Sequence, residues 1–122
     1  MSQNWGPHYL VPTEVIKTYS GTVKLRETYD EALLSKELES LGISGYVERV
    51  CNPWYFRKKN ANTWIKIGES QDRSENFSVK WDTRYLENGQ YEVMGLMHVF
   101  TKEGEEEQAI ARQNVVEVTV QN

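Results

Sequence analysis

Residues 77–91, F-S-V-K-W-D-T-R-Y-L-E-N-G-Q-Y, constrain the fold of this chain more than any other stretch. Residues 77–81 alternate between apolar and polar side chains, which is the pattern of a half-buried strand. Asp82 and Thr83 can hydrogen-bond nearby backbone amides and end that strand. Asn88-Gly89 tolerates positive φ and allows a turn into the next apolar run, which starts at Tyr91. The stretch therefore predicts a strand, a corner and a second strand.

The rest of the chain supplies further strand segments. Those that we expect cover residues 10–16, 21–27, 45–51, 54–58, 64–67, 90–101 and 109–121. Asn52-Pro53 indicates a bulge or bend on an exposed edge, because proline has no donor for a strand ladder. The chain has 122 residues, the size of one domain. We therefore expect an N-terminal arm over residues 1–9 and one all-β domain over residues 10–122.

One segment departs from the strand pattern. Residues 28–31, Thr-Tyr-Asp-Glu, have the spacing of a capping box. Leucines at 33, 34, 38 and 41 then recur at helical spacing, and Gly42 is suited to end a helix. The sequence predicts a helix over about residues 29–41, shorter than four turns, whose leucine stripe needs a surface to pack against.

Residues 81–91 resemble the W-D-T-x-x-L-x-N-G-x-Y signature of bacterial Ig-like domains, which occur in secreted, cell-surface and phage structural proteins. The segments S-G-T-V-K-L (20–25), Y-F-R (55–57) with T-W-I-K-I-G (63–68), and V-E-V-T-V (116–120) fit the same family, so the resemblance spans about residues 18–122. It implies an Ig-like antiparallel β-sandwich of about seven strands, with the helix inserted between the second and third. In this family Trp64 takes a core position, and Tyr91 that of a corner tyrosine whose hydroxyl bonds the backbone.

The strand expected over residues 90–101 is apolar on both of its faces. If its odd-numbered residues face the core, the other face carries Met94, Leu96, His98 and Phe100. A sandwich strand is normally polar on its solvent side, so this face needs cover. The helix stripe and a neighbouring subunit are the two alternatives, and both stay open. With Trp5 and Tyr9 of the N-terminal arm, these four residues are our predicted protein interface.

Composition narrows the classes of function. The net charge of −4 argues against non-specific nucleic-acid binding. The single cysteine, Cys51, permits no internal disulfide, and the two histidines, His8 and His98, have no metal-ligand spacing. No nucleophile or phosphate-binding motif is present, so we expect neither catalysis nor a cofactor or metal. No apolar run has the length of a membrane span, and the N-terminus lacks the layout of a signal peptide. The resemblance implies an extracellular, cell-surface or virion-associated protein.

Two interpretations of function follow. The first is a non-catalytic structural module that assembles with itself or with another protein. The alternative is a carbohydrate-binding module, for which Trp54 and Tyr55 are the candidate ligand contacts. The acidic run at residues 103–107 has the character of a solvated hairpin turn, because consecutive glutamates point to both faces and do not converge as calcium ligands do.

Overall fold

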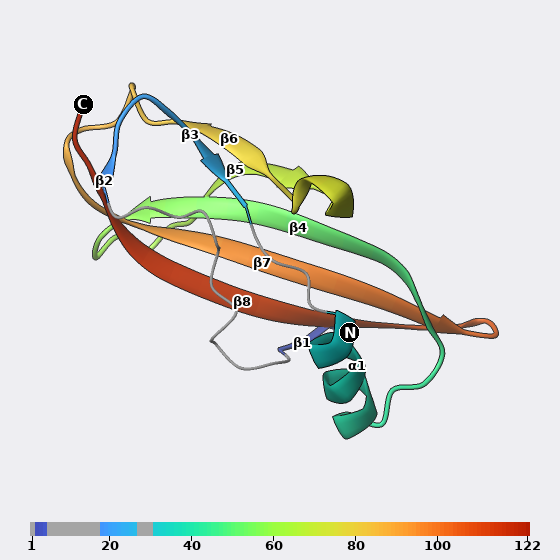
Figure 1. Ribbon diagram of the computed structural model, residues 1–122. Coiled ribbons are helices and arrows are strands. Elements are labelled where there is room, and N and C mark those ends of the chain that lie inside the picture. Colours follow the sequence, from blue (N-terminus) through green and yellow to red (C-terminus); the bar gives the residue numbers. More distant parts are fainter. Residues whose placement is uncertain (1, 5–17, 27–30) are drawn as a thin grey trace.

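The computed structural model describes residues 2–4, 18–26 and 31–122. This part of the chain is mostly β and forms a curled multi-strand sheet (Figure 1). Its elements are β1 (Ser2–Asn4), β2 (Thr18–Tyr19), β3 (Thr22–Leu25), α1 (Glu31–Ser40), β4 (Tyr46–Lys58), β5 (Ile65–Ser70), the short 3-10 helix η1 (Arg73–Glu75), β6 (Val79–Asp82), β7 (Gly89–Glu103) and β8 (Glu106–Val120).

The strands form one large sheet and one small one. The large sheet has the order β1-β8-β7-β4-β5, with β2 also paired to β8, and the small sheet consists of β3 and β6. Pairing is antiparallel except that β1 and β2 run parallel to β8, so the large sheet is mixed, where the sequence predicted antiparallel pairing throughout. The expected N-terminal arm contributes β1 to this sheet. Trp5, Tyr9 and the strand expected over residues 10–16 lie outside the described residues.

The prediction of a bulge or bend on an exposed edge at Asn52-Pro53 is wrong about the edge, whereas the ladder between β4 and β5 does shift register close by, between Trp54 and Tyr55. β4 is one continuous strand between β7 and β5, and both residues are buried within it. Cys51 and Trp54 keep the same register against β7, opposite His98 and Gly95 respectively. The ladder to β7 skips only the two positions between them, since proline has no N–H to donate. The strand therefore passes through the proline without shifting its side chains to the other face.

The large sheet has an inner face and an outer face, which we define by β7. Odd-numbered residues of β7 point to the inner face, and even-numbered residues from Met94 to Phe100 point to the outer face. Two apolar clusters lie on the inner face. The first contains Tyr19, Leu25, Trp54, Trp81, Tyr91, Val93, Val118 and Val120 below the small sheet. The second contains Leu34, Phe77, Met97, Val99 and Ile110 near the β7–β8 hairpin.

The corner predicted from residues 77–91 is present. Trp81 is 3% exposed and packs edge-on against Tyr19, with ring centroids 5.5 Å apart. The hydroxyl of Tyr91 donates a hydrogen bond of 2.8 Å to the backbone carbonyl of Glu87, which confirms the predicted bond from this hydroxyl to the backbone. Phe77, expected in the strand, lies before β6 with a φ of 54° and is fully buried in the second cluster.

The predicted helix is also present. α1 ends where expected, because Gly42 has a φ of 70° and its N–H donates to the carbonyl of Glu39 at 3.1 Å. The N–H of Ile43 donates to the carbonyl of Leu38 at 2.9 Å, and both side chains pack against the second cluster, which completes a Schellman motif. In the described residues, no helix has the length and apolar character to cross a membrane.

Candidate functional site

The outer face of the large sheet is built by three neighbouring strands, β4, β7 and β8. Its cross-strand rows are Arg57–Glu92–Glu117, Tyr55–Met94–Val115, Leu96–Gln113, Cys51–His98–Ala111 and Arg49–Phe100–Ala109. Charged rows therefore lie towards both ends, and the rows between them are largely apolar. α1 and the small sheet both pack on the other side, against the inner-face clusters.

The helix stripe does not cover the outer face. Leu34 is 3% exposed and packs with Met97 and Val99, which belong to the inner face. Leu38 joins the same cluster, and Leu41 is 40% exposed. Of the two alternatives for cover left open by the sequence, cover by the helix is therefore wrong. Both faces of β7 are apolar and suit the leucine stripe equally well, and the stripe packs on the inner face.

The four outer-face residues predicted on β7 lie together as expected. Met94 is 7% exposed, whereas Leu96, His98 and Phe100 are half-buried. The neighbouring strands extend this surface with Tyr55 from β4 and Val115, 38% exposed, from β8.

The polarity of the sheet is inverted at its centre. On the inner face, between the two apolar clusters, lie three buried polar side chains, Asn52, Arg112 and Asn114, which we call the polar row. At the same level the outer face carries the half-buried Leu96 and the exposed Gln113, with Val115 in the next row. The inner side is thus polar here, while Leu96 and Val115 remain partly accessible on the outer side.

Guanidinium groups occupy aromatic ring faces at both ends of the apolar rows. The guanidinium carbon of Arg49 lies 3.7 Å from the ring centroid of Phe100, and the ring of His98 stacks on the same Phe100 at 6.2 Å and 20°. At the other end, Arg57 lies 4.2 Å from the ring centroid of Trp64 and donates to the carboxylate of Glu92 at 2.8 Å. These contacts fix planar cations beside the apolar rows.

A shallow pocket of about 220 Å³ opens on the outer face between β5, β4 and β7, and it contains Cys51. The thiol of Cys51 donates to the carboxylate of Glu69 at 3.1 Å, and Lys66 pairs with the same carboxylate. Burial and this hydrogen bond raise the pKa of Cys51 to about 11. The partners Lys66 and Cys51 lower the pKa of Glu69, and burial lowers that of His98. The thiol is therefore protonated and unreactive at neutral pH.

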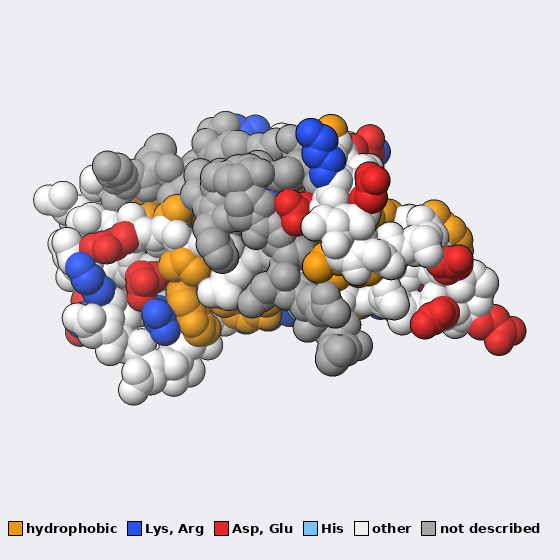
Figure 2. All heavy atoms as spheres, turned by 90° about the horizontal axis from the view of Figure 1, so that it is seen from below, with side chains coloured by type: hydrophobic (Ala, Val, Ile, Leu, Met, Phe, Trp, Pro, Cys, Tyr) orange, Lys and Arg blue, Asp and Glu red, His pale blue; other side chains and the backbone are white. Residues whose placement is uncertain are grey.

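The described residues contain no group of three or more histidine, cysteine or acidic side chains placed to hold a metal ion. The acidic turn projects at the end of the β7–β8 hairpin, and its exposed side chains form the red group at the right-hand end of Figure 2.

The structure exchanges the expected roles of two tryptophans. Trp54, predicted as a ligand contact, is fully buried and its indole N–H donates to the carbonyl of Phe77 at 2.9 Å, so it is a core residue. Trp64, predicted as core, is half-buried under Arg57 just before β5. Tyr55, the other predicted contact, is half-buried on the outer face beside the Cys51 pocket.

Comparison of the chain with protein-family models, with curated proteins and with solved structures found no match in any of the three. The interpretation of the outer face therefore depends on its own residues. The predicted interface did not include Arg49, Arg57 and Val115, and strand parity along β4 and β8 is the signal that places them on this face.

Proposed function

We propose that this chain is a non-catalytic, Ig-like structural module that binds another protein surface through the outer face of its large sheet. The resemblance of residues 18–122 to bacterial Ig-like domains supports this proposal, and it is also the basis for placing the module in a secreted, cell-surface or virion assembly. The partner is a second copy of the chain or a host protein of the same assembly.

The strand order supports the Ig-like part of the proposal. In Ig domains the third, sixth and seventh strands share a sheet, with the sixth in the middle, while the second pairs with the fifth. Counted from β2 as the first strand, the third, sixth and seventh strands of this chain are β4, β7 and β8, and they share the large sheet with β7 in the middle. The second and fifth strands by the same count are β3 and β6, which pair with each other. A buried tryptophan on the third strand and a corner tyrosine are further Ig features, and Trp54 and Tyr91 have these positions.

The proposal that the outer face binds a protein rests on the centre of the large sheet. Leu96 and Val115 lie on the accessible side, at the level where the buried side holds the polar row. Protein interfaces characteristically combine an apolar centre with a polar rim in which arginine and aromatic residues are enriched. The outer face has this arrangement, with Arg49 and Phe100 at one end and Arg57 and Trp64 at the other.

A carbohydrate-binding module is the second candidate, and the half-buried Tyr55 and Trp64 favour it. A sugar stacks on the open face of an aromatic ring, however, and one face of Trp64 and one face of Phe100 are already occupied by guanidinium groups. Tyr55 has no such partner among the described cation–ring contacts, so a glycan would bind there in a shallow pocket. A protein partner would contact the whole outer face, whereas a glycan would contact only the surroundings of Tyr55. We therefore prefer protein binding to carbohydrate binding.

The decisive experiment compares Leu96→Asp on the outer face with Val93→Asp on the inner face of the same strand. Leu96 is half-buried and Val93 is fully buried. We expect Val93→Asp to unfold the domain, because an unpaired carboxylate in the core is costly. Leu96→Asp should retain the far-UV circular dichroism spectrum of the wild type and a similar unfolding midpoint. Sedimentation velocity over a concentration series then measures self-association, which Leu96→Asp should abolish.

Two outcomes would contradict the proposal. If Leu96→Asp destabilises the monomer as much as Val93→Asp does, the chain itself covers the outer face. If the wild type stays monomeric at high concentration, and a glycan array gives saturable binding that Tyr55→Ala removes while Leu96→Asp does not, the carbohydrate-binding candidate replaces it.

A further inference from the structure

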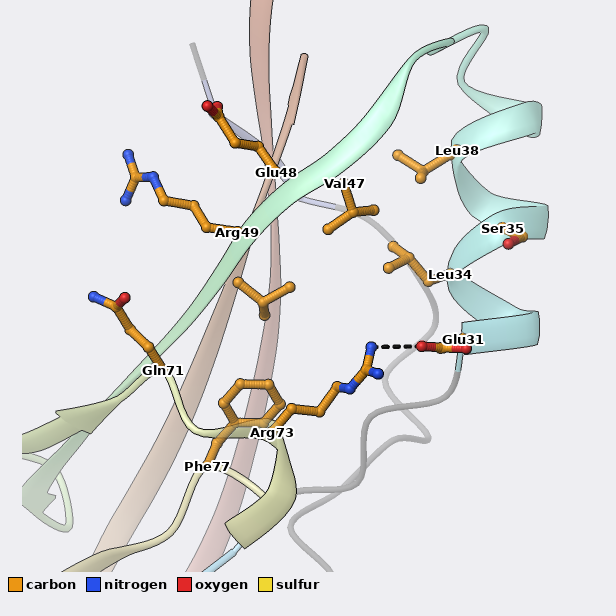
Figure 3. Close-up of a pocket in the computed structure, with 11 residues that line it drawn as sticks. Glu31, Leu34, Ser35, Leu38, Val47, Glu48, Arg49, Gln71, Arg73 and Phe77 are labelled. Carbon is orange, nitrogen blue, oxygen red and sulfur yellow. Dashed lines mark hydrogen bonds and ion pairs between the residues drawn. The ribbon is translucent and has the colours of Figure 1, made fainter.

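A cleft of about 510 Å³ lies between α1 and the first half of β4, with the β5–η1 connection at one end (Figure 3). Five apolar side chains line it: Leu34 and Leu38 from α1, Val47 and Val50 from β4, and Phe77. In Figure 3 the labelled leucines and Val47 point from opposite sides into the space between helix and strand. The outer face described above lies on the other side of the sheet and shares Arg49 with the lining of the cleft, so the two sites are distinct but adjoin at that residue.

The cleft exists because α1 is only partly docked on the sheet. Leu34 is buried at 3% exposure, but Leu38 is half-buried and Val47 is 36% exposed. Helices and sheets that pack directly interdigitate at close to crystalline density, which leaves no room between facing side chains. The volume here is within the range of about 300–1,000 Å³ that is typical of small-molecule sites.

The base of the cleft is fixed. Phe77 is fully buried with a φ of 54°, a backbone conformation that is rare for a bulky residue. Its carbonyl accepts the indole N–H of Trp54 at 2.9 Å, which ties it to the core of the sheet. The aromatic wall is therefore held in place before any ligand binds, and preorganisation of this kind lowers the cost of binding.

The charges around the cleft cancel and do not select an ion. Arg73 pairs with Glu31 across the lower end, with 60% and 66% of their side chains exposed. Glu48 and Arg49 also line the cleft, yet Figure 3 shows their side chains directed away from the helix. Two carboxylates and two guanidinium groups leave no net charge, so a buried ionic group of a ligand would lack a dedicated partner.

We propose that this cleft binds an uncharged apolar molecule, of the class of an alkyl chain with a neutral polar head. The chain would lie between Leu34, Leu38 and Val47 with its end near Phe77, and the polar head would remain at the open side.

The test uses the full chain labelled with ¹³C at Leu, Val and Ile methyl groups and titrated with 1-octanol, with sodium octanoate as the charged match. We expect saturable shifts of the Leu34, Leu38, Val47 and Val50 methyls with octanol. Octanoate should bind about tenfold more weakly, because its carboxylate would be partly dehydrated at the mouth of the cleft, where the charges of the lining cancel and offer no dedicated cation.

Val47→Phe fills the cleft, and Val115→Phe is its matched control on the outer face, since the two valines are 36% and 38% exposed. Val47→Phe should raise the octanol dissociation constant about tenfold, because it removes the space for the chain, and Val115→Phe should leave it unchanged. Should Val47→Phe fail to fold, Leu38→Gln serves as the second variant, since Leu38 is only half-buried.

Three results would overturn the proposal. The first is that octanol shifts no cleft methyl and at most shifts the Leu96 and Val115 methyls. The second is that octanoate binds as tightly as octanol, which would show that Arg73 selects an anion. The third is that the two phenylalanine variants weaken binding equally, which would show that the effect does not arise in the cleft. None of these results bears on the outer face, so this proposal and the protein-binding proposal fail independently.

Discussion

Replacing Trp54 with phenylalanine tests the exchange of roles between the two tryptophans. Trp54 is fully buried and its indole N–H donates to the Phe77 carbonyl at 2.9 Å. The substitution removes this hydrogen bond, which contributes about 0.5–1.5 kcal/mol. It also leaves a cavity where the larger ring stood, at a cost of about 1–2 kcal/mol. We expect the free energy of unfolding to fall by about 2–3 kcal/mol, a large part of the roughly 5–15 kcal/mol of a typical domain.

Trp64→Phe is the matched control. Trp64 is half-buried and its identified ring contact is with Arg57 at 4.2 Å. An exposed contact of this kind contributes about 0.5–1 kcal/mol, and phenylalanine keeps part of it. Trp64→Phe should therefore cost less than about 1 kcal/mol. Urea unfolding monitored by far-UV circular dichroism measures both variants, and an unchanged slope shows that the two-state comparison is valid.

The hydrogen bond and the cavity can be separated at the same position. The benzothiophene analogue of tryptophan keeps the ring volume of Trp54 but has no N–H. It should lose only the hydrogen-bond part, about 0.5–1.5 kcal/mol. Equal losses for Trp54→Phe and Trp64→Phe, or a larger loss for Trp64→Phe, would refute the reasoning and restore Trp64 as the core tryptophan.

Two further predictions concern single groups. Tyr91→Phe removes the hydroxyl that donates to Glu87 and should lower the free energy of unfolding by about 0.5–1.5 kcal/mol, measured by the same urea titration, without changing the circular dichroism spectrum. The pKa of Cys51, raised to about 11, predicts slow reaction with a thiol reagent at pH 8 and a rate that increases up to about pH 11. The pKa of Cys51 is higher in the folded chain than the unfolded value of about 8.5. The protonated thiol therefore contributes its full share to the free energy of unfolding below about pH 8.5, and this share is lost as the pH rises through 11. The difference in free energy of unfolding between wild type and Cys51→Ala should shrink over that interval.

The local features of the fold could be predicted from sequence because their signals are local. The corner before Tyr91 follows from short polar side chains and an Asn-Gly turn, and the end of α1 at Gly42 follows from the need for positive φ. The predicted alternation of β7 side chains between the two faces is also found along the strand, since its pairing with β8 contains no register shift. That parity placed Leu96 and its neighbours on one face before any long-range contact was known.

The long-range choices could not be predicted in this way. The alternation of β4 correctly placed Trp54 and Phe56 on one face but did not say which face is the core. That choice depends on the register with β7, in which Trp54 lies opposite Gly95 and so shares a face with the inward-pointing odd residues of β7. The side on which α1 packs was open for the same reason, because both faces of β7 are apolar. Neither answer is encoded in a short window of sequence.

The middle of β8 shows how an apolar side chain comes to lie on the outer face, where we propose that a partner binds. A slip of one residue in β8 would move Arg112 and Asn114 outwards and Val115 inwards, as local hydrophobicity alone would favour. The same slip would expose Ile110 and Val118, which anchor the two inner clusters at the ends of the strand. Each such side chain contributes roughly 1.5–3 kcal/mol when buried, so the ends of β8 determine the register and the middle does not. The apolar centre of the outer face is thus a feature that folding does not require, and contact with another protein surface is what would give it a use.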